Sequence, residues 1–73
     1  MPKLPVLSGQ EVRSILEAHG FQKVRQRGSH MVMQRLEASG TTTIPVPDHA
    51  ELRSGTLHSI IRQSGLEVDA FHR

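Results

Sequence analysis

Apolar residues recur at helical spacing in a first stretch that begins near residue 9. The stripe consists of Val12, Ile15, Leu16 and His19. Ser8 and Glu11 have the Ser-x-x-Glu spacing of a capping box, in which each side chain satisfies a backbone amide of the other residue. Gly20 follows the stripe and can end a helix, because glycine adopts the left-handed conformation of a C-terminal cap. The pattern predicts a helix that ends at Gly20.

A second apolar stripe predicts another helix near the C-terminus. It consists of Leu57, Ile60, Ile61 and Ser64. Ser54 or Thr56 could cap the start of this helix, and Gly65 would close it. The tail, residues 66–73, leaves room for one further turn. Its apolar residues, expected to cover the edge of the core, are Leu66, Val68 and Phe71.

Between these stripes, β-type patterns predict three strands. Residues 22–27 and 30–36 flank the dipeptide Gly28-Ser29, and glycine can take the positive φ that a type II′ hairpin turn requires. Residues 41–46 are rich in β-branched side chains and predict a third strand. Pro45 cannot donate a ladder hydrogen bond, so this strand is expected at an edge or near its own end. Residues 47–52 would form a connection with room for a short helical turn.

The Gly28-Ser29 turn fixes a register for the hairpin. It pairs Arg27 with His30, Arg25 with Val32, and Val24 with Met33. Side chains alternate between the two faces of a strand. One face would then be buried and made of Val24, Met31, Met33 and Ile44, and the other would be basic and carry Lys23, Arg25, Arg27 and His30. The expected fold class is α+β, with three antiparallel strands and both helices on the apolar face.

The chain has 73 residues, which predicts one domain over residues 1–73 with a small core. It has no cysteine, so stability must come from well-patterned helices and strands, with or without help from a partner. No stretch approaches the roughly 20 apolar residues of a membrane span, and the N-terminal apolar segment is too short for a signal peptide. A cytoplasmic protein is therefore expected.

Positive charge is concentrated on the hairpin although the net charge is only +2. Residues 21–36 include four basic residues and no acidic one. A local basic surface favours phosphate groups or an acidic protein as partner, and a merely solvated sheet face is the alternative. The five histidines show neither His-x-His nor His-x-x-x-His spacing, so neither a zinc site nor another cofactor is predicted.

Several motifs together resemble the HicA toxin family. They are the Ser8-Gly9-Gln10-Glu11-Val12 run, Gly20-Phe21, Gly28-Ser29-His30, the Ile44-Pro45-Val46-Pro47-Asp48-His49 run, and Gly55-Thr56-Leu57 with Ile60-Ile61. Their order spans nearly the whole chain. The resemblance implies an α-β-β-β-α fold like a double-stranded RNA-binding domain. It also implies a toxin of a toxin–antitoxin system, an endoribonuclease that cuts messenger RNA and is neutralised by a HicB antitoxin. The family's active-site histidine corresponds to His30.

The residues around His30 suit RNA cleavage without a metal, because RNA carries its own nucleophile in the 2′-hydroxyl. An imidazole exchanges protons near neutral pH. The residues expected to bind phosphate are Lys23, Arg25 and Arg27. Ser29 could bind a phosphate oxygen or only shape the turn. The second proton-transfer group is open: His49 is the first candidate, although it could instead brace the connection, and water or the substrate is the second.

Two other functions remain compatible with the sequence. A non-catalytic RNA-binding module could use the same fold and the same basic face. A pure interaction module could use the basic face only to bind an acidic protein.

Overall fold

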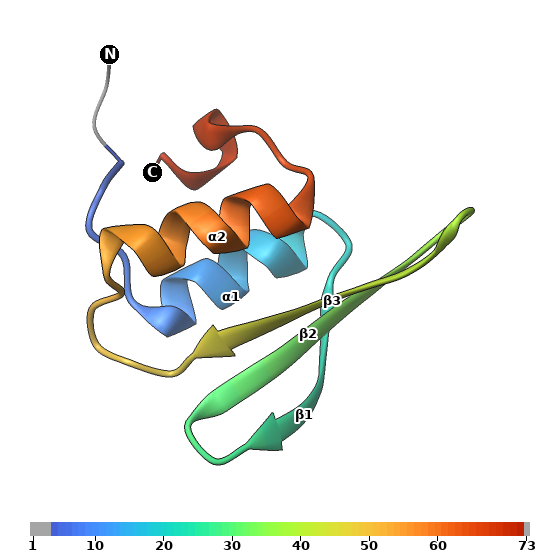
Figure 1. The fold of residues 1–73 in the computed structure, drawn as a ribbon, viewed down its shortest axis with the longest axis horizontal. Helices are drawn as coiled ribbons and strands as arrows, with labels where there is room; N and C mark the ends of the chain where they lie inside the picture. The colour runs from blue at the N-terminus through green and yellow to red at the C-terminus, as the bar shows by residue number, and fades with distance from the viewer. Residues whose placement is uncertain (1–3, 73) are drawn as a thin grey trace.

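The computed structural model describes residues 4–72 and shows two helices over a three-stranded sheet (Figure 1). The elements are helix α1 (Gly9–Ala18), strands β1 (Gln22–Arg27), β2 (His30–Glu37) and β3 (Gly40–Pro47), helix α2 (Ser54–Ser64), and a 3₁₀ helix η1 (Val68–Phe71). The strands are antiparallel in the order β1-β2-β3, and both helices lie on one side of the sheet. This order confirms the predicted α+β fold of the double-stranded RNA-binding-domain type.

Helix α1 begins with the predicted capping box. The backbone N–H of Glu11 donates to the Ser8 Oγ at 3.0 Å, and the Ser8 N–H donates to the Glu11 Oε1 at 2.9 Å. The two bonds satisfy amides that have no partner inside the helix. Past the helix, Gly20 has a φ of 92°, which glycine adopts without the clash of a Cβ.

Helix α2 starts differently from the prediction. Arg53 is its N-cap, and neither Ser54 nor Thr56 caps it, because both lie inside the helix. Within the described residues no side chain bonds to the amides of its first turn as a cap. Its end agrees with the prediction: Gly65 has a φ of 72°, and the buried Ser64 hydroxyl donates to the Ile61 carbonyl and accepts from the Leu66 N–H.

The hairpin turn has the expected geometry. Gly28, the first central residue of the turn, has a φ of 57°, whereas the φ of Ser29, the second, is not positive. This combination is that of a type II′ turn. Arg27 pairs with His30, and Arg25 with Val32, in the predicted register. Strand β3 is an edge strand, which accommodates Pro45.

A β-bulge corrects the prediction for the start of β1. The register shifts between Lys23 and Arg25, so Lys23, not Val24, is the partner of Met33. The extra residue in β1 breaks the strict alternation of faces. Val24 is 46% exposed and lies outside the core, contrary to the prediction. Arg25 and Arg27 form a row of cations on the sheet face that carries His30. Lys23 does not belong to this row: paired residues point to the same face of a sheet, and its partner Met33 is buried on the helix side.

The core lies between the sheet and the helices. Its fully buried apolar side chains are Val12, Leu16, Phe21, Met31, Met33, Ile44, Val46, Leu57, Ile60 and Phe71. The tail contributes Phe71 as predicted, and Leu66 packs against the cluster. Val68 is 42% exposed, so this part of the tail prediction was wrong. None of the helices in the described part of the chain is both long and apolar enough to span a bilayer.

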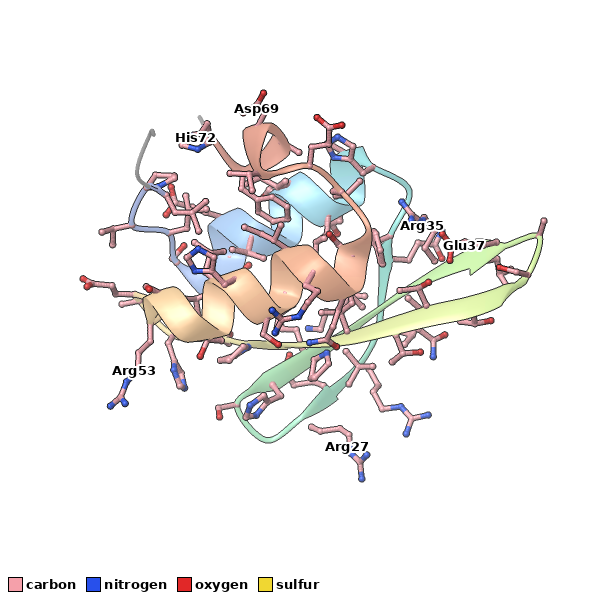
Figure 2. The ribbon with its side chains drawn as sticks, turned by 45° about the horizontal axis from the view of Figure 1, so that its top comes forward. Arg27, Arg35, Glu37, Arg53, Asp69 and His72 are labelled. Carbon is pink, nitrogen blue, oxygen red and sulfur yellow. The ribbon has the colours of Figure 1, made fainter. Side chains whose placement is uncertain are left out.

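Arg35 joins the C-terminal ends of both helices to the sheet. Its guanidinium donates to the carbonyls of His19 and Ser64, each at 3.2 Å, and lies 4.5 Å from the ring centre of Phe21. Figure 2 shows its side chain beside that of Glu37, with which it forms a 2.7 Å ion pair. Hydrogen bonds from the Thr42 hydroxyl and from Arg35 lower the pKa of Glu37. A cation placed against two helix C-termini complements both helix dipoles.

Candidate functional site

His30 is the first residue of β2 and stands between two strands. Its cross-strand neighbours are Arg27 on β1 and Pro47 on β3. Directly opposed residues in an antiparallel pair have Cβ atoms roughly 5 Å apart, so the imidazole and the Arg27 side chain share one surface. His30 is exposed, and Figure 2 shows Arg27 extending away from the helices at the hairpin end. The predicted pairing of imidazole and cation is therefore present.

The imidazole lies in a groove that the sequence did not predict. The groove has a volume of about 410 Å³ and follows the β3 edge beside α2; its lining residues are His30, Pro45, Pro47, Gly55, Thr56, Ser59, Ile60 and Gln63. Small-molecule sites in proteins typically enclose roughly 300–1,000 Å³, so the groove is large enough for a nucleotide-sized group.

The groove has an apolar part and a polar part. Pro45 and Pro47 provide the accessible apolar surface, and the buried Ile60 lies beneath it. Hydroxyl and amide groups of α2 provide the polar wall, in which the Gln63 Nε2 donates to the Ser59 Oγ at 3.0 Å. Positions 59 and 63 are one helical turn apart, and this spacing brings their side chains together. The groove thus combines an ionisable group, an apolar surface and hydrogen-bonding side chains.

The segment after β3 is held by two neighbouring elements. The Asp48 N–H donates to the Ser29 carbonyl at 2.7 Å, and the Gly9 N–H donates to the His49 carbonyl at 2.9 Å. Gln10 donates to the Asp48 carboxylate at 3.0 Å. These bonds fix the hairpin turn and the end of β3 relative to α1. Because Pro47 is the partner of His30, they also fix one side of the groove.

The structure separates the site residues expected from the sequence. His30, Arg25 and Arg27 share a face, whereas the bulge takes Lys23 out of their row. Ser29 lies in the turn, and its backbone carbonyl is occupied by Asp48. His49 is exposed and is not among the residues that line the groove; its carbonyl braces α1.

The contribution of α2 to the groove could not be predicted from the sequence. The polar α2 residues that line the groove together with His30 are separated from it by more than twenty positions in the sequence; they are Thr56, Ser59 and Gln63. Arg53, the N-cap of α2, adds an exposed cation next to the start of the groove wall, and Figure 2 shows its side chain extending away from the helices as Arg27 does. Only the path of the chain after β3 brings these groups together. Among residues 4–72, no group of three or more His, Cys, Asp or Glu side chains is arranged to hold a metal ion.

A comparison with protein-family models finds a match that covers most of the chain. The model is described as the HicA toxin of bacterial toxin-antitoxin systems, and it matches residues 9–66. The chain belongs to the HicA toxin family. A search of curated proteins found no match. The matched residues 9–66 include His30 and every other residue that lines the groove.

Membership of the HicA family makes this chain the toxin member of a toxin–antitoxin pair. A HicA protein is the toxin of a toxin–antitoxin pair, so a partner of the antitoxin kind belongs to its function. The same membership is consistent with the α-β-β-β-α order of the structure.

Proposed function

We propose that this HicA toxin is an endoribonuclease that cuts messenger RNA and that a HicB-type antitoxin neutralises it. The observation that supports the proposal is the position of His30. It stands beside Arg27 at the hairpin end and opens into a groove large enough for a nucleotide. An exposed imidazole between a cation and a nucleotide-sized groove suits proton transfer at a phosphodiester.

RNA supplies the nucleophile for this reaction. Attack by a 2′-hydroxyl on the adjacent phosphorus forms a bond to O2′ and breaks the bond to O5′ of the next nucleotide. One proton leaves the 2′-hydroxyl and one arrives at the departing oxygen. His30 acts as the base in the first transfer, a role that typically contributes about 10²- to 10⁴-fold to a rate. Since His49 does not line the groove, solvent in the open groove is the proposed source of the second proton.

Cations on the same surface would stabilise the transition state. Charge develops on the phosphoryl oxygens during attack, and groups already placed beside it lower the barrier. Arg27 is the direct partner of His30, and Arg25 pairs with Val32 two positions further along β2. Both are exposed and therefore available to the RNA backbone. Ser29 shapes the turn in this proposal, and its backbone carbonyl, which accepts from the Asp48 N–H, ties the turn to the end of β3.

Neutralisation would follow from covering the same surface. An antitoxin that buries His30 together with Arg25 and Arg27 excludes RNA from the groove and from the cations at once. Acidic or hydrogen-bonding groups are expected on the partner opposite these residues, because buried cations require compensation.

The test is the substitution His30→Ala, with His58→Ala as its matched control. His58 is also an exposed histidine, its Nδ1 lies 2.8 Å from the Ser54 carbonyl, and it does not line the groove. We expect both variants to melt within about 2–4 °C of the unchanged protein, since exposed substitutions usually change stability by less than about 0.5 kcal/mol. Cleavage of single-stranded RNA in chelator, and growth arrest, should disappear only in His30→Ala.

A folded His30→Ala protein that cuts RNA near the original rate would remove His30 from the mechanism. RNA retention without cleavage by the unchanged protein would instead favour a non-catalytic RNA-binding module. If the unchanged protein neither cuts nor binds RNA, the result would favour a pure interaction module that binds an acidic protein.

A further inference from the structure

We propose that the groove between β3 and α2 reads a nucleobase next to the scissile phosphate, with Gln63 as the residue that selects adenine. This inference rests on the proposed function and adds the location and chemistry of a base-binding subsite. The observation behind it is that the Gln63–Ser59 pair and His30 line one groove.

The path of the chain sets the direction of the groove. Strand β3 ends at Pro47, the partner of His30, and α2 then returns along β3 in the opposite direction (Figure 1). His30 therefore lies at the Gly55 end of the groove. Gln63 lies eight residues further along α2, about 12 Å at 1.5 Å per residue. A phosphate held at His30 would place an attached nucleotide along the groove toward Gln63.

The apolar part of the groove can receive the flat face of a base. Proteins commonly stack single-stranded bases on aromatic rings. This chain has two phenylalanines and no tryptophan or tyrosine, and both Phe21 and Phe71 are fully buried. An aliphatic surface must replace the aromatic one. Within the groove, the exposed Pro45 and the half-buried Pro47 provide it.

The Gln63 amide supplies the hydrogen-bonding pattern. One N–H of its Nε2 is directed to the Ser59 Oγ at 3.0 Å, and this bond holds the amide in place. The carbonyl oxygen and the second N–H remain available at the exposed end of the residue. An amide side chain pairs in this way with the adjacent donor and acceptor of adenine.

A second hollow provides a matched control within the molecule. It is lined by Gly20, Gln22, Val24, Gln34 and Leu36. Gln34 donates to the Thr43 Oγ1 at 3.3 Å, so it forms a glutamine–hydroxyl pair like that of Gln63. Its hollow does not include His30, because Gln34 lies four positions further along β2. A base-reading role should therefore belong to Gln63 and not to Gln34.

The first experiment compares cleavage patterns on RNA that contains every sequence context. The unchanged protein should favour adenine at one position flanking the cut. Gln63→Ala should weaken this preference about fivefold or more, the factor expected from loss of an amide–base pair. Gln34→Ala should keep the preference. An identical preference in Gln63→Ala and in the unchanged protein would overturn the inference while leaving RNA cleavage itself established.

The second experiment does not depend on cleavage. Short all-2′-deoxy strands lack the nucleophile and can be titrated into labelled protein, with dU-dA-dA-dU compared against a four-residue dU strand. The adenine strand should bind more tightly and shift the side-chain signals of Gln63 and His30, and Gln63→Ala should remove the difference. Equal affinity for both strands, shifts confined to Arg25 and Arg27, or no binding would each overturn the inference. If the adenine strand binds as expected but RNA is never cut, the subsite stands and the nuclease proposal fails.

Discussion

Replacing Gly9 with alanine should destabilise the protein, although alanine is the better helix former. Gly9 is the first residue of α1, where its backbone approaches the end of β3. A Cβ added at this position would lie 2.0 Å from the Pro47 carbonyl oxygen and 3.0 Å from the Asp48 Cα. Contacts under 3.0 Å essentially never occur for a Cβ, so α1 and β3 would have to separate by at least 1 Å.

The size of the effect follows from three contributions. Separation breaks the 2.9 Å bond from the Gly9 N–H to the His49 carbonyl, which is worth about 1 kcal/mol. Forcing extra atoms into a packed contact costs about 1–3 kcal/mol. The higher helix propensity of alanine offsets at most about 1 kcal/mol of this loss in stability. The net loss in free energy of unfolding is about 1–3 kcal/mol, which lowers the melting temperature of a domain of this size by about 5–20 °C.

Urea and thermal unfolding, followed by circular dichroism, measure this change. Gly55→Ala is the matched control, since Gly55 also lies in the first turn of a helix and its added Cβ would meet nothing within 4 Å. The free energy of unfolding of Gly55→Ala should equal that of the unchanged protein or exceed it by up to about 1 kcal/mol. If Gly9→Ala were as stable as Gly55→Ala, the close approach of α1 to β3 would be wrong.

Two further predictions concern cations. Arg35→Met should lower the free energy of unfolding by about 1–3 kcal/mol in urea, because the carbonyls of His19 and Ser64 lose a charged donor; unchanged stability would show that these bonds contribute nothing. RNA binding should weaken with salt, and Arg27→Ala should reduce the slope of log K against log salt by about 0.7. Lys23→Ala should change the slope less, since the bulge removes Lys23 from the row of His30; an equal effect in filter binding would contradict this assignment.

The parts of the fold that could be predicted are those set by local chemistry. The Ser8–Glu11 box and Gly65 mark helix ends through contacts between near neighbours, and the structure has both. The Gly28-Ser29 turn fixed the pairing of Arg27 with His30 for the same reason. Period-two alternation then placed Met31 and Met33 in the core.

The errors arose where distant residues decide the outcome. Val24 has the composition of a core strand residue, but a bulge is a property of two paired strands and leaves no clear signal in one of them. The closeness of Gly9 to Pro47, and the contacts of Arg35 with two helix ends, likewise depend on tertiary packing. The groove wall on α2 was missed because no motif connects Gln63 to His30.

The two prolines of β3 also limit how this molecule can associate with other chains. A strand that adds to a sheet edge needs alternating N–H donors and carbonyl acceptors from its new neighbour. Pro45 and Pro47 have no N–H, so the end of β3 beside His30 offers acceptors without donors at those positions. Extension of the sheet past β3 is therefore disfavoured at that end, which protects the protein from edge-to-edge aggregation where its groove must stay open.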